Sequence, residues 1–282
     1  MKELKDNSID LVVTSPPYYN APFDFPGMFK SYEEFLQLMK DVAKELLRVM
    51  KQGRIVCLVT DDMLVNGVKY PIIADITKIF MEAGFRYRDK IIWRKPEGYI
   101  RISRRSGVTI QHPFPMYFYP DNLKEEIIIF QKGEYDYKSN NSNKEKSKID
   151  IKEFQKNKWY LTVWDITNVL PAAKEAKFTA VFPDEIPNRL IKLFSFVGDT
   201  ILDPFLGSGT TMKVARKLGR NSVGYEIDLE LEKVIKEKVG YNLVGGNGFE
   251  IIKREDAKKL RTNLNKQINE TLAKNYKKVN SR

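Results

Sequence analysis

Residues 200–211 read Thr-Ile-Leu-Asp-Pro-Phe-Leu-Gly-Ser-Gly-Thr-Thr, and this stretch decides the fold. The short apolar run that ends at Asp203 is typical of a buried strand, and the pattern predicts a helix from Thr210 onward. The glycine turn Gly207-Ser208-Gly209 lies between them. Glycine lets a ligand approach the backbone, and the first turn of a helix offers free amide donors. The stretch therefore predicts a βα turn that binds a nucleotide-like cofactor.

Strand and helix patterns alternate on both sides of this turn. Strands are predicted over residues 9–13, 55–60, 86–93, 126–130, 222–226 and 250–253, and helices over 31–50, 75–83, 186–196, 210–218 and 229–238. This alternation predicts an α/β fold with a doubly wound, mostly parallel sheet. The polar segment 138–158 is rich in Ser, Asn and Lys, which indicates a flexible loop or a partly disordered insertion.

The overall composition is that of a globular protein with one large α/β domain. The chain has 282 residues, of which 42% are hydrophobic and 30% are charged. It contains no apolar run near the roughly 20 residues that span a bilayer, and its first residues show no secretory pattern, so a cytoplasmic location is expected. The formal net charge of +11 favours a polyanionic partner, although such an excess also serves solubility.

Cysteine and histidine are nearly absent, which restricts the chemistry of the protein. Cys57, the single cysteine, lies in an apolar run and is expected to be a buried core thiol. His112 is the single histidine, so zinc sites built from several histidines are excluded. We expect no metal cofactor.

A second motif, Thr14-Ser15-Pro16-Pro17-Tyr18, follows the predicted strand 9–13. A hydroxyl, two prolines and an aromatic ring at the end of a strand form a rigid polar edge beside a flat stacking surface. This arrangement suits a planar base that is held by its amino edge. Taken alone, Ser15 is equally consistent with a helix cap and Tyr18 with core packing.

The cofactor type follows from the glycine turn and from the next strand end. Gly224-Tyr225-Glu226-Ile227-Asp228 places a carboxylate where it can accept hydrogen bonds from ribose hydroxyls. Met212 occupies the place of the third glycine of a dinucleotide fingerprint. The hydroxyl-rich turn suits the amino-acid end of a cofactor. S-adenosylmethionine is therefore favoured over a dinucleotide.

Residues 203–211, 223–228 and 14–18 together resemble the amino-methylating DNA methyltransferases. The catalytic motif precedes the cofactor motif, an order that resembles the β-type permutation of this family. The resemblance covers roughly residues 1–100 and 175–257. It implies a seven-stranded, Rossmann-like methyltransferase fold with an inserted DNA-recognition region. The Ser-Pro-Pro-Tyr form is typical of enzymes that methylate cytosine N4, whereas Asp-Pro-Pro-Tyr is usual for adenine N6.

The resemblance assigns two groups of residues, and the basic composition of the middle segment indicates a third. The catalytic group is Ser15, Pro16, Pro17 and Tyr18. The S-adenosylmethionine group is Asp203, Pro204, Phe205, Gly207, Ser208, Gly209, Thr210, Glu226, Ile227 and Asp256. The basic stretch between two predicted strands is the candidate DNA-reading surface, with Arg94, Lys95, Arg101, Arg104 and Arg105.

The predicted organisation has four parts. Residues 1–97 form the catalytic half, 98–172 the target-recognition region with a returning strand near 123–131, 173–257 the cofactor half and 258–282 a basic tail. Relatives commonly carry a Gly-Asp-Ala segment just before the catalytic strand. Here the similar segment, Arg254-Glu255-Asp256-Ala257, lies at the other end of the chain. We therefore expect the two termini to lie close together, with Leu260 near Leu4.

The predicted function is site-specific methylation of cytosine N4 in duplex DNA, with the target base flipped out of the helix. The alternatives are an adenine-N6 enzyme, an RNA or protein-glutamine methyltransferase, and a catalytically silent DNA-binding module. An NAD-dependent dehydrogenase is opposed by the incomplete glycine pattern. The resemblance also allows a restriction endonuclease as partner, and either a monomer or a homodimer.

Overall fold

The computed structural model describes residues 1–21, 27–96, 106–138, 141–169, 182–241 and 248–254, and in the tail 262–263, 265–266 and 268–270. Its centre is a seven-stranded sheet with the order β7-β5-β6-β2-β1-β8-β9. The strands are β1 (Ile9–Thr14), β2 (Met50–Thr60), β5 (Arg86–Arg94), β6 (Lys124–Gln131), β7 (Val163–Asp165), β8 (Thr200–Asp203) and β9 (Asn221–Gly224). This mostly parallel sheet confirms the predicted fold class.

One strand runs against the others. β6 is antiparallel to both β2 and β5, whereas β1, β2, β8 and β9 pair in parallel, as do β5 and β7. The carboxyl ends of the six parallel strands therefore lie at one edge of the sheet, together with the amino end of β6. We call this the carboxyl edge and the opposite one the amino edge.

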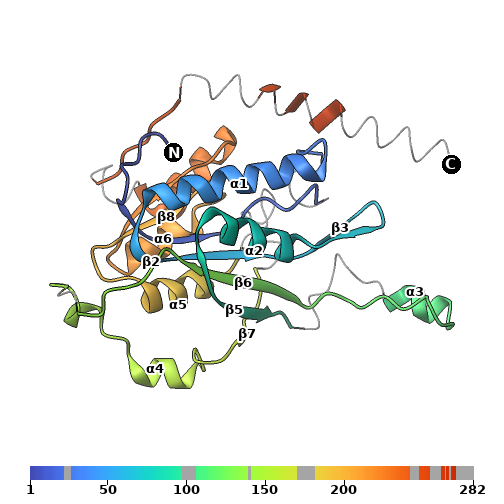
Figure 1. Cartoon of the computed structure of the whole chain (residues 1–282), viewed down its shortest axis with the longest axis horizontal. Helices are drawn as coiled ribbons and strands as arrows, with labels where there is room; N and C mark the ends of the chain where they lie inside the picture. The colour runs from blue at the N-terminus through green and yellow to red at the C-terminus, as the bar shows by residue number, and fades with distance from the viewer. Residues whose placement is uncertain are drawn as a thin grey trace.

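Helices cover both faces of the sheet, as Figure 1 shows. On one face, α1 (Tyr32–Val49) and α2 (Ile72–Ala83) bury apolar side chains such as Phe35 and Phe80 against β1, β2 and β6. On the other face, α5 (Glu185–Phe194) and α6 (Thr210–Lys217) pack on the alternate side chains of the same strands. Strand residues alternate between the two faces, so each strand contributes to both cores. A final helix, α7 (Glu232–Val239), packs on α6.

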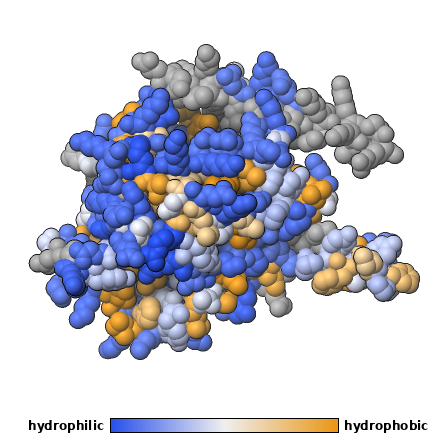
Figure 2. Space-filling view, in the orientation of Figure 1, coloured by the Kyte–Doolittle hydropathy of each residue, from blue (hydrophilic) through white to orange (hydrophobic). Residues whose placement is uncertain are grey.

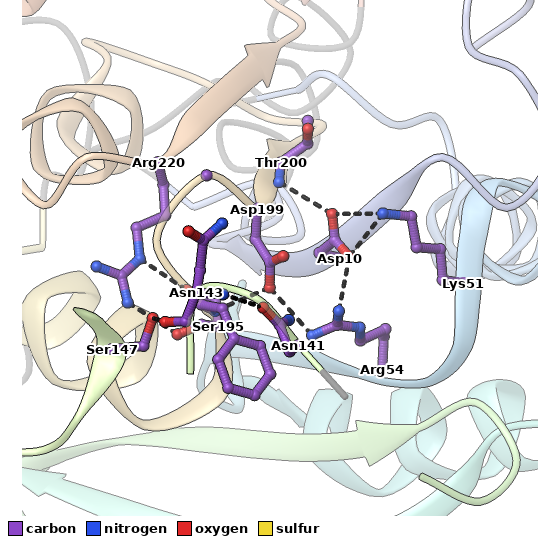
Figure 3. Close-up of polar contacts among 12 residues, drawn as sticks. Asp10, Lys51, Arg54, Asn141, Asn143, Ser147, Ser195, Asp199, Thr200 and Arg220 are labelled. Atoms are coloured by element: carbon purple, nitrogen blue, oxygen red, sulfur yellow. Dashed lines mark hydrogen bonds and ion pairs between the residues drawn. The ribbon is translucent and has the colours of Figure 1, made fainter. Parts of the chain in front are cut away.

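A network of charged side chains holds the amino edge together (Figure 3). Asp10 is buried near the start of β1, where the pairing register with β2 shifts. Its carboxylate lies 2.8 Å from the Lys51 ammonium and 2.9 Å from the Arg54 guanidinium, and it accepts a hydrogen bond from the Thr200 amide. Arg54 also contacts Asp199 at 3.0 Å. The network thus joins the starts of β1, β2 and β8.

Two expectations about secondary structure are wrong. Residues 250–253 form no strand, and Ile252 is 64% exposed, because the two isoleucines stand between charged residues and offer no buried face. The seventh strand is β7 at the other end of the sheet, where Trp164 is buried. Segment 138–158 is also more ordered than its composition indicated. It contains a 3₁₀ turn (Glu145–Ser147) and α4 (Ile151–Lys156), whose amino end is capped by Asp150.

Arg254, the last described residue before the tail, contacts the amino-terminal segment. The Arg254 guanidinium lies 3.0 Å from the Glu3 carboxylate, and the Tyr225 hydroxyl donates to the same carboxylate at 3.2 Å. Leu260, which the sequence placed near Leu4, lies outside the described residues. Figure 1 shows the amino-terminal segment beside the chain that leads toward the tail. Within the described part of the chain, every helix is too short or too polar to span a lipid bilayer.

An arm extends from the carboxyl edge between β5 and β6. We define it as residues 96–122, of which 96 and 106–122 are described. Figure 1 shows that its short helix, α3 (Ser106–Gln111), lies well away from the sheet. The root of the arm is closed by a hydrogen bond from the Lys95 amide to the Leu123 carbonyl, 2.7 Å long. The arm therefore starts and ends at the same edge of the sheet as the strand ends that carry both sequence motifs.

Candidate active site

The structure brings the two sequence motifs together at the carboxyl edge. β1 and β8 are neighbours, so the motif that follows β1 meets the motif that follows β8. The Thr14 hydroxyl donates a hydrogen bond to the Asp203 carboxylate at 2.6 Å, across 189 residues of sequence. The Thr211 hydroxyl, in the first turn of α6, donates to the Val13 carbonyl at 3.2 Å. Two independent hydrogen bonds thus join the motifs.

Asp203 is a buried carboxylate that the described residues supply only with uncharged donors. Besides Thr14, the Phe205 amide donates to it at 3.1 Å, and its side chain is 2% exposed. Burial raises its pKa to about 6, although the hydrogen bond from Thr14 opposes the shift. No salt bridge joins it to a cation within the described part of the chain. A bound cation would restore the ionised form.

Glu226, half-buried just beyond the end of β9, is a second carboxylate that receives only uncharged donors from the described residues. Its two oxygens accept hydrogen bonds from the Gly207 amide at 2.8 Å and from the Asp228 amide at 2.7 Å. Burial raises its pKa to about 7. The Tyr225 amide donates to the Asp203 carbonyl, and the Leu206 amide donates to the Tyr225 carbonyl. The acidic residue is thus anchored directly to the glycine turn.

The glycine turn requires glycine at one position in particular. Gly209 has a φ of +91° at the amino end of α6, and a Cβ atom there would lie 3.3 Å from Val239 of α7. Next to it, the Thr210 hydroxyl is buried and has no hydrogen-bond partner among the described residues. An orphaned buried hydroxyl is costly unless a ligand completes it. Ser208 is different, because Lys238 of α7 donates to its hydroxyl at 2.8 Å.

The other residues assigned to the cofactor differ in how far they are buried. Pro204 is buried, Phe205 is half-buried, and Ile227 is 41% exposed beside Glu226. Asp256 lies outside the described residues.

The catalytic motif lies directly after β1, with Pro16 buried and Ser15 and Pro17 half-buried. Tyr18 is 5% exposed, and its hydroxyl donates to the Glu125 carboxylate of β6 at 2.6 Å. Burial raises the pKa of Tyr18 well above its usual value, so the phenol stays protonated. The Tyr18 ring is therefore buried at the carboxyl edge and is not exposed on the surface.

Glu125 was not recognised in the sequence. It forms an ion pair with Lys95 in addition to its bond with Tyr18. Only its position at the start of a buried strand could have drawn attention to it, because its partner Tyr18 is 107 residues away.

Two of the five basic residues that were assigned to DNA are paired within the protein. Arg94 makes a bidentate contact with Asp165 of β7, and Lys95 pairs with Glu125. A role for these two in DNA contact stays a prediction. Arg101, Arg104 and Arg105 lie outside the described residues. The described residues contain no group of three His, Cys, Asp or Glu side chains that could hold a metal ion.

Known proteins are similar to this chain both in sequence and in structure. The profile of a family described as DNA methylase, the N6/N4 methyltransferases, matches residues 9–237. The type II methyltransferase M.MjaI of Methanocaldococcus jannaschii is 34% identical over 273 residues, covering 85% of this chain and 88% of its own. M.MthZI of Methanothermobacter thermautotrophicus is 32% identical over 280 residues, covering 90% of this chain and 77% of its own.

Solved structures agree with the sequence comparison. TTHA0409 of Thermus thermophilus, described as a putative DNA modification methylase and complexed with S-adenosylmethionine, has a TM-score of 0.68 at 29% identity. The match covers 88% of this chain and 90% of that one. The cytosine-N4-specific PvuII DNA methyltransferase has a TM-score of 0.63 at 18% identity, covering 95% and 88%, which shows a shared fold.

Proposed function

Because this chain belongs to the N6/N4 DNA methylase family, we propose that it moves a methyl group from S-adenosylmethionine to the N4 amino group of a cytosine flipped out of duplex DNA. The observation that carries the proposal is the Thr14–Asp203 hydrogen bond, which puts the base-holding motif beside the cofactor turn. The serine of the Ser-Pro-Pro-Tyr motif supports cytosine as the base. A cognate restriction endonuclease and a homodimer stay predictions.

The residues around the glycine turn fit S-adenosylmethionine. The ammonium of its methionine end is a cation of the kind that Asp203 lacks, and its ribose hydroxyls are donors of the kind that Glu226 accepts. The buried Thr210 hydroxyl is a further partner for the amino-acid end, and Ile227 is an apolar cover for the adenine. When bound, S-adenosylmethionine supplies a methyl group on an electrophilic sulfonium.

The chain's own residues prepare the target amine. The lone pair of the cytosine amino group is delocalised into the ring, so the nitrogen is a poor nucleophile. Hydrogen-bond acceptors on its two hydrogens favour a tetrahedral nitrogen whose lone pair is free to react. The Ser15 hydroxyl and the Pro16 carbonyl are the proposed acceptors. The adjacent prolines hold the backbone so that these acceptors need no rearrangement during the reaction.

The arm is the proposed DNA-contacting element. It leaves the sheet at the same edge as both motifs and has an aromatic tip, in which Phe114 and Phe118 are 64% and 72% exposed and Met116 is 91% exposed. Figure 2 shows this apolar end projecting beyond the polar body. Arg101, Arg104 and Arg105 in the same segment supply cations for phosphates and guanine edges. Stacking and charge neutralisation together suit a flipped-base complex.

Arg104→Ala combined with Arg105→Ala tests the arm. We expect DNA affinity to fall by about tenfold at moderate salt, because two phosphate-neutralising charges are lost. The affinity for S-adenosylmethionine, measured by calorimetry, is expected to stay the same. Unchanged DNA affinity in a salt titration would contradict the assignment.

Adenine N6 is the second candidate, because the family includes enzymes for both amino groups. The deciding experiment is methylome sequencing of a methylation-deficient host that expresses the chain. Digestion of its DNA to nucleosides then separates N4-methylcytosine from N6-methyladenine. We expect N4-methylcytosine at one short sequence. N6-methyladenine alone would exclude the cytosine assignment, and an absence of both would exclude DNA methylation.

A further inference from the structure

The end of the arm contains a methionine in a backbone conformation that methionine rarely adopts. Met116 has a φ of +75° and is 91% exposed. It is the third residue of a β-turn in which the Tyr117 amide donates to the Phe114 carbonyl at 3.3 Å. Pro115 holds the second position at a negative φ, so the turn is of type II, whose third position favours glycine or asparagine. Among the described residues, the other non-glycine residues with positive φ are Asn7, Asn20, Asn66 and Lys158.

The rest of the arm holds this strained turn in place. The Thr109 hydroxyl of α3 donates to the Tyr117 carbonyl at 2.7 Å, and the His112 and Tyr117 rings lie 5.2 Å apart between centroids. These contacts attach the residue after Met116 to α3, while Met116 itself stays almost fully exposed. The folded chain thus gains no burial from Met116 in return for the strain. Backbone strain of this kind is typical of sites that bind a partner.

The chemistry of the turn indicates how it contacts DNA. Residues 106–120 contain no Asp, Glu, Lys or Arg, so they cannot neutralise phosphates with those side chains. Phe114, Met116 and Phe118 are exposed and have no hydrogen-bond donor with which to read the edge of a base. Apolar side chains, methionine and phenylalanine included, are the ones that proteins insert between neighbouring base pairs. A turn that presents such a side chain suits insertion into the base stack.

We propose that Met116 is a wedge that inserts between two neighbouring base pairs of duplex DNA, at a step separate from the methylated base. This inference rests on the proposed function, because it takes duplex DNA as the partner. Figure 1 shows α3 well away from the sheet, so the turn that follows α3 reaches a different part of the duplex from the base held at the carboxyl edge.

The wedge adds sequence preference without a hydrogen bond to any base. Insertion unstacks one base step, and the cost of unstacking depends on the sequence of that step. Pyrimidine–purine steps deform most easily. Met116 is therefore a specificity-determining residue that selects a pyrimidine–purine step beside the methylated sequence.

The experiment locates the unstacked step with 2-aminopurine, a fluorescent adenine analogue that brightens when it is unstacked. Short duplexes that contain the methylated sequence carry the analogue at one flanking position after another. We expect brightening at one flanking step on binding of the wild-type chain. We also expect about fivefold tighter binding when that step is pyrimidine–purine than when it is purine–purine.

Met116→Gly removes the wedge and suits the positive φ, so the variant is expected to fold with an unchanged or higher Tm. It is expected to lose both the flanking brightening and the step preference. Met116→Leu keeps a long apolar side chain and is expected to retain both. Met81→Ala is the matched control, because Met81 is a 53% exposed methionine near the end of α2 that leads to the amino edge. It is expected to behave as the wild type.

Three results would overturn the inference. They are flanking brightening that persists in Met116→Gly, a lower Tm in that variant, and a dimer of the DNA-free chain that Met116→Gly converts to monomers in sedimentation. The last result would make the turn a contact between two copies of the chain. A wild-type chain that neither binds duplex DNA nor methylates it would instead refute the proposed function.

Discussion

Each of the two edges of the sheet contains a buried aspartate, but the two aspartates differ in whether a cation lies beside them in the described part of the chain. At the amino edge, Asp10 lies within 2.9 Å of both Lys51 and Arg54 (Figure 3). At the carboxyl edge, Asp203 meets only a hydroxyl and an amide among the described residues, and its pKa rises to about 6. Two cations balance the charge of Asp10, whereas the described residues give Asp203 no cation. Burial alone therefore does not distinguish the two carboxylates, but the presence or absence of a cation among the described residues does.

The largest effect is expected from Ser15→Ala at the carboxyl edge. Removal of a preorganised acceptor for the target amine is expected to lower the methylation rate by about 10²-fold to 10³-fold. The affinity for S-adenosylmethionine should not change, since Ser15 is not assigned to the cofactor. Single-turnover kinetics and calorimetry measure the two quantities. Near wild-type turnover in this variant would remove Ser15 from the mechanism.

The second-largest effect is expected at the amino edge, and it concerns the stability of the fold instead of the activity. Arg54→Met leaves Asp10 and Asp199 buried without their shared cation, which is expected to cost about 3 kcal/mol of unfolding free energy. Arg86→Met is the control, because Arg86 pairs with Glu134 on the surface and should cost less than about 1 kcal/mol. Urea unfolding measures both. Equal losses of unfolding free energy in the two variants would mean that the buried network stabilises the fold no more than the surface pair does.

The smallest effect is a pH dependence at Glu226. Its pKa rises from 4.5 to about 7 on folding, so between these values the folded chain holds more protons than the unfolded chain. Stability without S-adenosylmethionine should therefore fall as pH rises through this window. Affinity for S-adenosylmethionine should rise by about tenfold from pH 6 to pH 7.5, because the ionised carboxylate accepts hydrogen bonds better.

Glu226→Gln provides the comparison for the pH profile. This variant is expected to lose both the fall in stability and most of the rise in affinity between pH 6 and pH 7.5. Calorimetry and thermal unfolding at matched ionic strength follow the two profiles. A profile that keeps its full slope in Glu226→Gln would assign the titration to another group, such as Asp203.

The sequence predicted the strands that carry the motifs because those strands have unbroken apolar runs beside glycine, proline and carboxylate signals. β1 and β8 lie within one residue of their predicted bounds. The short strand β7 gave no comparable signal, since its three residues are ordered by the burial of Trp164 against β5. In segment 138–158, the helix α4 depends on one cap and on an ion pair between Glu153 and Lys192. Such local contacts are invisible in composition.

At the candidate site, too, the motifs were visible in the sequence but their contacts were not. Asp203, Glu226 and Ser15 were recognisable because each ends a strand within a distinctive motif. The partners that set their chemistry were not, since they come from other strands. Thr14 reaches Asp203 across 189 residues, and Tyr18 reaches Glu125 across 107. Contacts at such separations depend on strand order, which periodicity does not determine.

The contact between Arg254 and Glu3 bears on the order in which the gene can encode the two motifs. A short peptide that joins the segment after Arg254 to the amino terminus would connect these two points, and the chain could then open before Phe182. The rearranged gene would encode the glycine turn first and the Ser-Pro-Pro-Tyr segment second, with every strand in its present place. One new link between the two ends and one new opening would therefore convert the motif order of this chain into the opposite order.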